Sequence, residues 1–172
     1  HTLSYNRAMR SMKPVRASLV LVSLVVIAGC SGLLRSPTDP PATIPLEAQD
    51  FVTRMNEHRV SQGLAPLAWH DEIADVALAH SQDMRDRGFF DHTNPDGDSP
   101  FDRMAAAGIT YRSAGENIAY GYSTGAAVFD GWINSTGHRA NIENASFTHH
   151  GVGYVEDGHY WTHVFAGEPA VE

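Results

Sequence analysis

Apolar residues recur at helical spacing along much of the chain, and the clearest example covers residues 71–87. In this segment the apolar positions follow the i, i+3, i+4, i+7 spacing of one helix face. The members of that face are Ile73, Val76, Ala77, His80 and Met84. Acidic residues at the start of the segment and arginines at its end suit the helix dipole. The pattern therefore predicts an amphipathic helix over residues 71–87.

A second amphipathic helix is predicted near the start of the folded part of the chain. Residues 46–62 place Phe51, Met55 and Val60 along one stripe with polar residues elsewhere. Gly63 follows this segment and is typical of a helix end. We therefore expect Phe51, Met55 and Val60 to face the core.

Two shorter helices are predicted further along the chain. Ser99 is a typical N-cap for a helix over residues 100–108, and Pro100 suits its first position. Residues 124–134 form the other predicted helix. Its apolar pairs at i, i+4 spacing are Val128 with Trp132 and Phe129 with Ile133. Both segments are expected to pack against the rest of the domain.

The C-terminal part of the chain is rich in residues that favour strands. Two such runs flank Asp157-Gly158, a dipeptide that is typical of a hairpin turn. Helices combined with a terminal hairpin favour an α+β sandwich over a series of βαβ units.

The first thirty residues have the pattern of an export signal. Lys13 and Arg16 precede the apolar run 18–29, which ends in small residues, as a secretory signal peptide does. The run ends in the sequence IAGC, and its Cys30 is the only cysteine of the chain. This sequence resembles the bacterial lipoprotein box, in which a diacylglyceryl group is attached to the cysteine. Acylated Cys30 would then anchor the protein to a lipid membrane.

The boundaries of this region follow from the same pattern. We expect residues 1–29 to be the signal peptide, with residues 1–11 upstream of the true start, because Met12 is a more natural first residue than His1. A membrane-spanning helix over residues 17–34 is the alternative, since these 18 residues reach the roughly 17–25 that a span needs.

A proline-rich stretch separates Cys30 from the folded domain. Residues 30–45 contain Pro37, Pro40, Pro41 and Pro45, which favour an extended, semi-rigid spacer. The alternative is an ordered loop packed on the domain. We expect the domain to cover residues 46–168 and residues 169–172 to form a short tail.

Charge excludes one class of partner. The chain has 172 residues and a net charge of −8, and residues 30–172 hold eight arginines, no lysine and all twenty acidic residues. A body this acidic is repelled by a phosphate backbone, so we expect no binding to nucleic acid. The single cysteine also excludes an internal disulfide framework and any site with several cysteine ligands.

Four ordered motifs carry the strongest functional signal. They are HSQDM…GFFDH (80–92), AGENIAYGY (114–122), WINSTGHRANI (132–142) and FTHHGVGY…YWTHVF (147–165). Together they resemble the CAP family of secreted proteins, which includes plant pathogenesis-related proteins of class 1, cysteine-rich secretory proteins and insect venom antigens. The closest likeness is to the short bacterial branch. The resemblance covers residues 48–167 and implies an α+β fold, a three-layer α-β-α sandwich with a central antiparallel sheet.

The resemblance also implies a cleft in which two histidines and two acids hold a divalent metal, often zinc. His92, Glu116 and His138 match three of these positions. The second acid normally follows the tryptophan of its motif, but Asn134 or Ser135 stands in its place, which weakens the expected metal binding. Two imidazoles and one carboxylate still suffice as protein ligands of an open zinc site.

The alternative to a metal site is a hydrogen-bonded structural cluster, in which Glu116 accepts from imidazole N–H groups. In either case a carboxylate beside His92 and His138 is expected to raise both histidine pKa values.

Four more residues are candidates for lining the cleft: His80, Asn117, Ser135 and Arg139. His80 is interpreted first as a core residue, and Asn117 as a residue that ties down the backbone of its own loop. Arg139 would pair with an acid or clamp an acidic ligand. Ser135 could form a nucleophilic set with His138 and Glu116, but no glycine-framed elbow surrounds it. The sequence therefore assigns no catalytic residue.

These features lead to one main functional hypothesis. We expect an extracytoplasmic, lipid-anchored CAP-domain protein that binds a small hydrophobic molecule, such as a lipid or sterol, or another envelope component. The alternative is a metal-assisted hydrolase acting on peptide, ester or cell-wall material, and a third option is a purely structural envelope lipoprotein. The missing second acid favours binding over catalysis.

Overall fold

The computed structural model describes residues 35–168, so the predicted signal peptide, Cys30 and the tail at 169–172 lie outside the described residues. Within this range the elements follow in the order α1 (Leu46–Ser61), β1 (Ala68–Trp69), α2 (Asp71–Arg87), α3 (Pro100–Ala106), β2 (Ser113–Ala119), α4 (Gly125–Ile133), α5 (Thr136–Ile142), β3 (His149–Val155) and β4 (Tyr160–Gly167). No helix between residues 35 and 168 is long and apolar enough to cross a membrane.

The strands form one sheet in the order β1-β3-β4-β2. The pairs β3–β4 and β2–β4 are antiparallel, as expected, whereas the two-residue edge strand β1 runs parallel to β3. The predicted hairpin is confirmed, because β3 ends at Val155 opposite Tyr160 of β4 and Asp157-Gly158 lies in the turn between them. Gly158 has a φ of 78° there, in the left-handed region that glycine adopts without strain.

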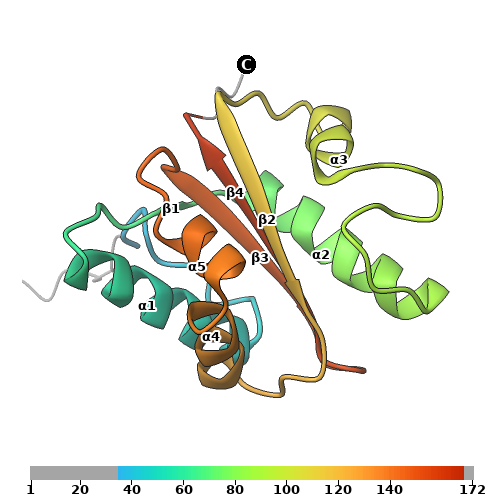
Figure 1. Cartoon of the computed structure of the whole chain (residues 1–172), viewed down its shortest axis with the longest axis horizontal. Coiled ribbons are helices and arrows are strands. Elements are labelled where there is room, and N and C mark those ends of the chain that lie inside the picture. The colour runs from blue at the N-terminus through green and yellow to red at the C-terminus, as the bar shows by residue number, and fades with distance from the viewer. Residues whose placement is uncertain (1–34, 169–172) are drawn as a thin grey trace, which may run out of the picture. The chain divides into compact units, whose positions relative to one another are not determined.

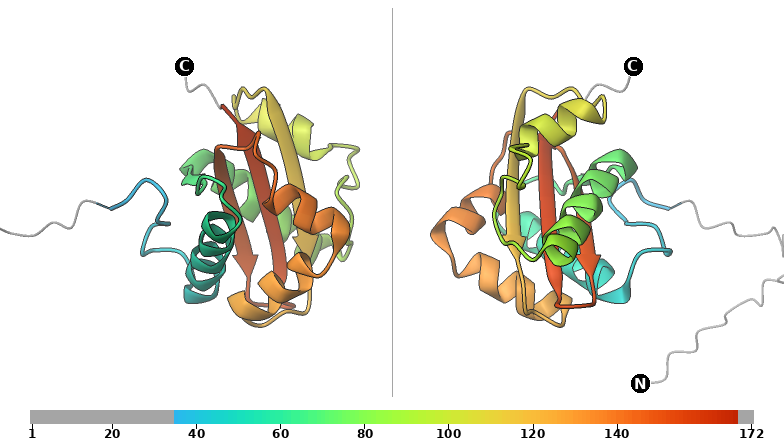
Figure 2. Two further views of the ribbon diagram at one scale, coloured as in Figure 1. Left: turned by 60° about the vertical axis from the view of Figure 1, so that its left-hand side comes forward. Right: turned by 90° about the vertical axis from the view of Figure 1, so that its right-hand side faces the viewer.

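Helices cover both faces of the sheet, which confirms the three-layer α-β-α arrangement (Figures 1 and 2). Helices α1, α4 and α5 pack together on one face, and α2 with α3 covers the other. Helix α2 lies unusually close to β3, because a Cβ atom at Gly151 or Gly153 would run into the backbone of the helix at Ala74 and Leu78. The glycines of the GVG motif therefore seat α2 directly on the sheet.

The helix predictions for residues 71–87, 100–108 and 124–134 are confirmed within one or two residues at each end. Gly88 ends α2 in the left-handed conformation with a φ of 68°. Ser99 and Asp102 form a capping box at the start of α3, and Thr124 caps α4 through its side chain. Strands β1 and β2 and helix α5 are not predicted from the sequence pattern.

One position of the predicted stripe on α1 is wrong. Phe51 and Met55 are fully buried, but Val60 is 58% exposed and Arg59 takes the core-facing position instead. The i, i+4 spacing from Phe51 through Met55 leads to Arg59. Its buried guanidinium is satisfied by the backbone carbonyls of Ala65, Ile142 and Asn144, with donor–acceptor distances of 2.9, 2.6 and 3.1 Å.

Residues 35–45 differ from the expected spacer, because they are ordered against the domain. The backbone N–H of Trp69 donates to the carbonyl of Pro37 at 2.8 Å, and the side chain of Gln49 donates to the carbonyl of Ile44 at 2.8 Å. Ile44 also packs on the apolar core between α1 and the sheet. The segment 35–45 thus follows the alternative interpretation, an ordered loop.

Candidate functional site

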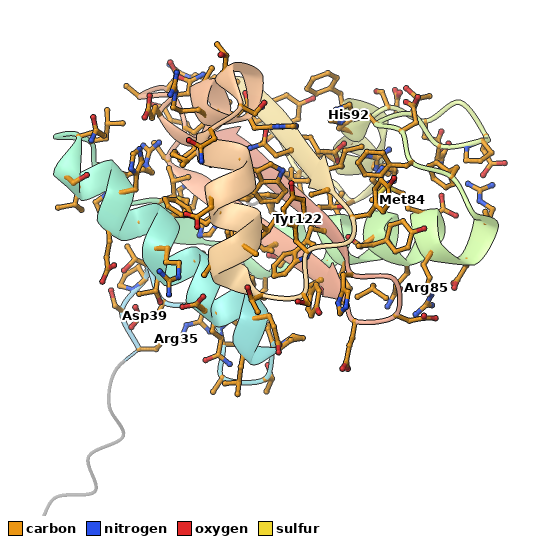
Figure 3. All side chains as sticks on the ribbon, turned by 60° about the horizontal axis from the view of Figure 1, so that its bottom comes forward. Arg35, Asp39, Met84, Arg85, His92 and Tyr122 are labelled. Atoms are coloured by element: carbon orange, nitrogen blue, oxygen red, sulfur yellow. The ribbon has the colours of Figure 1, made fainter. Side chains whose placement is uncertain are left out.

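A pocket of about 730 Å³ lies where the loop after α2, the end of β2 and the α4–α5 connection meet. Its aromatic lining residues are Phe90, Tyr120, Tyr122 and Trp132, and its polar lining residues are Asp91, His92, Ser135 and His138. His92 and Tyr122 are labelled in Figure 3, on the loop after α2 and beside α4. The pocket therefore brings together residues from the second and third sequence motifs named above and from the end of the first.

Hydrogen bonds and close packing hold part of the aromatic wall of the pocket in place. Trp132 Nε1 donates to the carbonyl of Ile118 at 3.3 Å, and Trp161 Nε1 donates to the carbonyl of Tyr122 at 2.7 Å. Gly131 leaves room for the ring of Tyr122, since a Cβ atom at this position would lie 2.8 Å from the Tyr122 hydroxyl. Trp132 is thus tied to β2, the main chain at Tyr122 is tied to β4, and the Tyr122 ring packs against α4 at Gly131.

Glu116 lies behind the pocket, with its side chain only 2% exposed. Its Oε1 accepts from His92 Nδ1 at 2.8 Å, and its Oε2 accepts from the guanidinium of Arg103 at 2.7 Å. Arg103 also donates to the carbonyls of His92 and Asp98, at 2.9 and 3.0 Å. The pair of Arg103 and Glu116 therefore ties the loop after α2 to strand β2 and orients His92.

The pKa values of the two pocket histidines are shifted in opposite directions. The hydrogen bond to Glu116 and the charge of its carboxylate raise the pKa of His92, against the effect of burial. Burial, together with the nearby His92, lowers the pKa of His138. The expectation that both pKa values rise is wrong for His138, because Glu116 bonds to His92 and Arg103 and not to His138.

The donor atoms do not form a metal site as they stand. Among residues 35–168, no group of three or more His, Cys, Asp or Glu side chains is placed so that it could hold a metal ion. Both oxygens of Glu116 already accept hydrogen bonds from protein donors. The arrangement is a hydrogen-bonded cluster, and zinc binding by His92, Glu116 and His138 stays a prediction.

Of the four remaining candidates, Ser135 lines the pocket, whereas the other three do not. Ser135 lines the pocket, but its hydroxyl makes no hydrogen bond to His138 in the described part of the chain, so the nucleophilic set is not assembled. His80 is 1% exposed, and its Nε2 hydrogen-bonds to the carbonyl of Asp91 at 3.0 Å. Burial lowers the pKa of His80. His80 is thus a core residue, and it does not line this pocket.

Asn117 and Arg139 differ from their expected roles. The side chain of Asn117 donates to the carbonyl of His138 at 3.0 Å and accepts from Asn141 at 2.8 Å. It therefore ties β2 to α5, not to its own loop. Arg139 is exposed and forms no ion pair with another residue of the range 35–168.

Sequence reasoning missed two residues of the site. Arg103 holds Glu116, but in the sequence it stood out only as a basic residue beside the apolar Met104 in a short helix. Phe90 lines the pocket mouth, and the sequence indicated it only as the second of two aromatic residues before Asp91-His92 in the first motif.

Comparisons with known proteins agree on one family. The family model described as "Cysteine-rich secretory protein family" (CAP) matches residues 52–167. The protein YkwD of Bacillus subtilis is 47% identical over 131 residues, which cover 76% of this chain and 51% of YkwD. YlbC of the same organism, described as a membrane protein, is 43% identical over 110 residues, which cover 64% of this chain and 31% of YlbC. This chain thus spans about half of YkwD and a smaller part of YlbC.

Solved structures give the same result for the fold. An extracellular protein from Bacillus anthracis that contains an SCP domain superimposes with a TM-score of 0.66 and 39% identity, covering 70% of this chain and 39% of that protein. A cysteine-rich secretory protein from Staphylococcus aureus superimposes with a TM-score of 0.64 at 21% identity, covering 75% of this chain and 40% of that one. The second likeness concerns the fold alone.

Proposed function

Since the chain belongs to the CAP family of cysteine-rich secretory proteins, we propose that it is an exported binding protein whose pocket holds the apolar part of a small envelope ligand. The observation that carries this proposal is the pocket itself. Its volume of about 730 Å³ falls within the range of small-molecule sites, roughly 300–1,000 Å³. Aromatic rings with a few convergent polar groups are also the usual lining of such sites.

The polar groups of the pocket support binding over catalysis. The hydroxyl of Ser135 makes no hydrogen bond to a base among the described residues, and both oxygens of Glu116 accept hydrogen bonds from Arg103 and His92. A hydrolase needs an activated nucleophile or an activated water. The groups left at the pocket surface, His92, His138 and Ser135, suit hydrogen bonds to a ligand instead.

The location and the anchor are part of the same proposal. The Bacillus anthracis relative is described as extracellular, and the signal-like run before Cys30 agrees with export. We place the domain outside the cytoplasm, held to the membrane through acylated Cys30. Membrane fractionation tests the anchor: the wild-type chain should sediment with membranes, and a Cys30→Ala variant should not.

A neutral fluorescent probe tests the pocket. N-phenyl-1-naphthylamine, added to the full chain, should gain fluorescence on binding. A Ser135→Trp substitution should fill the pocket and weaken this binding by about tenfold or more, a loss of about 1.4 kcal/mol. Ser135 makes no side-chain capping bond at the start of α5, so the substitution removes no cap.

Arg139→Trp is the matched control, because Arg139 is exposed on the same helix and does not line the pocket. This variant should bind the probe like the wild type. Equal probe binding by the Ser135→Trp variant, or no binding by the wild type, would overturn the proposed pocket.

A further inference from the structure

Exposed aromatic rings continue from the pocket mouth onto the surface. Phe90 is 45% exposed and Tyr120 is 58% exposed, and both line the pocket. Their ring centroids lie 4.8 Å apart, and the ring of Tyr160 lies 6.1 Å from Tyr120 at an interplanar angle of 27°. Tyr160 is half-buried and lies outside the pocket lining. Phe90, Tyr120 and Tyr160 therefore form a row, the aromatic row, that leads out of the pocket.

The fold holds this row in place. Phe90 follows α2, whereas Tyr120 and Tyr160 lie at the neighbouring ends of β2 and β4. Ala119 of β2 pairs with Trp161 of β4, so the next residues along the register, Tyr120 and Tyr160, are cross-strand neighbours. A single exposed ring needs no explanation, but two exposed rings that continue into a third, half-buried ring beside a pocket indicate an interaction site.

Charge restricts what the aromatic row binds. Residues 35–168 contain eight arginines and no lysine against nineteen acidic residues. Asp91 also lies on the pocket wall, next to Phe90. An anionic polymer or an anionic lipid surface would be repelled by this domain. The ligand of the row is therefore uncharged or cationic.

The exposure of the aromatic row to solvent favours a sugar chain over an acyl chain as its ligand. An acyl chain laid across exposed rings keeps much of its own apolar surface in water, so it gains little from burial. A pyranose ring has an apolar C–H face that stacks on an aromatic ring, while its hydroxyl groups around the edge stay hydrated. His92, His138 and Ser135 offer hydrogen-bond partners for such hydroxyls at the pocket.

We propose that the aromatic row binds an uncharged glycan chain, with successive sugar rings on Tyr160 and Tyr120 and the end of the chain in the pocket. This inference rests on the proposed function, since it names the ligand class of the same pocket.

Uncharged N-acetylglucosamine oligomers test the proposal, with binding to the full chain measured by titration calorimetry. The hexamer should bind more tightly than the dimer. Tyr120→Ala should weaken hexamer binding by about three- to tenfold, as expected for the loss of one stacked ring. Tyr160→Ala should weaken hexamer binding but leave dimer binding unchanged, because Tyr160 lies outside the pocket.

Phe101→Ala is the matched control, since Phe101 is 48% exposed on α3 and packs near Tyr111, away from the pocket. This variant should bind the hexamer like the wild type. If the naphthylamine probe binds but no oligomer does, the glycan inference is overturned and the pocket stands. If neither binds, both proposals are overturned. A loss in Phe101→Ala as large as that in Tyr120→Ala would also overturn the role of the row.

Discussion

His150 Nδ1 and His163 Nε2 lie 3.0 Å apart in the core, where two neighbouring strands carry them side by side. Both residues are fully buried, and the rings of Phe51 and Phe165 pack against His163. Burial, aided by the positive charge of Arg59, lowers the pKa of His150 to about 3. Burial and the neighbouring His150 lower the pKa of His163 well below its usual value of 6.5. The pair is therefore neutral in the folded protein.

This pair predicts that the domain loses stability in mild acid. In the unfolded chain both histidines take up a proton as the pH falls through about 6.5. The stabilising contribution is thus complete above that pH and is lost progressively toward the folded pKa, about 3 for His150. Two protons bound only by the unfolded state give a slope of about 2.7 kcal/mol per pH unit. Urea unfolding between about pH 5.5 and pH 4.5 measures the total slope, to which this pair contributes alongside the other histidines with shifted pKa values.

A His163→Phe variant isolates one of the two protons. It should lower the slope by about 1.4 kcal/mol per pH unit. It also leaves His150 Nδ1 without its partner, so stability near neutral pH should fall by about 1–3 kcal/mol. His80, His138 and His149, whose pKa values are also lowered, and His92, whose pKa is raised, contribute equally to both proteins. An unchanged slope would contradict the prediction.

Gly151→Ala and Gly153→Ala are each predicted to destabilise the fold. Each new methyl group would meet the backbone of α2, at Ala74 or Leu78, which cannot move aside as a flexible side chain could. Overpacking of this kind costs about 1–3 kcal/mol, and backbone contact puts the cost at the upper end. The midpoint of urea unfolding reports the change.

Gly137→Ala is the control for these substitutions. Gly137 lies inside α5, and a Cβ atom there would meet nothing within 4 Å. Alanine inside a helix is better than glycine by about 0.5–1 kcal/mol, so this variant should be slightly more stable than the wild type. Equal effects at Gly137 and Gly151 would show that helix-to-sheet contact is not the cause.

Arg103→Met is predicted to cost about 3–5 kcal/mol, because it leaves the carboxylate of Glu116 buried without its cation. It also removes the donors to the carbonyls of His92 and Asp98, so amide exchange across residues 91–98 should become faster. A double variant, Arg103→Met with Glu116→Met, should recover much of the stability. No recovery would mean that the loop contacts of Arg103, not the unpaired charge, carry the effect.

Zinc affinity is predicted to be limited by the same ion pair. Coordination by Glu116 would require one of its oxygens to leave Arg103 or His92, and such charge-assisted bonds contribute about 1.5–3 kcal/mol. That cost lowers affinity by about ten- to a hundredfold. In a zinc titration of folded protein, Arg103→Met should bind more tightly than the wild type, and His92→Ala should bind less tightly. Unchanged affinity in Arg103→Met would refute this competition.

Helix α2 and the C-terminal hairpin could be predicted because their patterns were complete. The face from Ile73 to Met84 repeats without interruption, and Gly88 ends the helix in a conformation that glycine favours. Strand β2 could not be predicted, because its sequence, SAGENIA, contains only one of the branched and aromatic residues that favour strands, Ile118. Its polar residues Glu116 and Asn117 are buried and satisfied only by distant partners.

The candidate site, like the fold, could be predicted only in part. The motifs brought His92, Glu116 and His138 to one region, but their order around the pocket depends on Arg103, whose partner lies in another element. Val60 and Arg59 show the same limit on α1. An arginine takes the core position only because three carbonyls from other segments converge on it, and spacing along one helix does not contain that information.

The direct contact of α2 with Gly151 and Gly153 affects the width of the pocket mouth. The separation between this helix and β3 is set by main-chain atoms in contact, so rotamer changes cannot alter it. The chain passes from α2 into the loop that carries Phe90 and His92, while the facing wall grows from β2 of the same sheet. By fixing the position of α2 on the sheet, Gly151 and Gly153 thus also fix the spacing between the two walls of the pocket mouth.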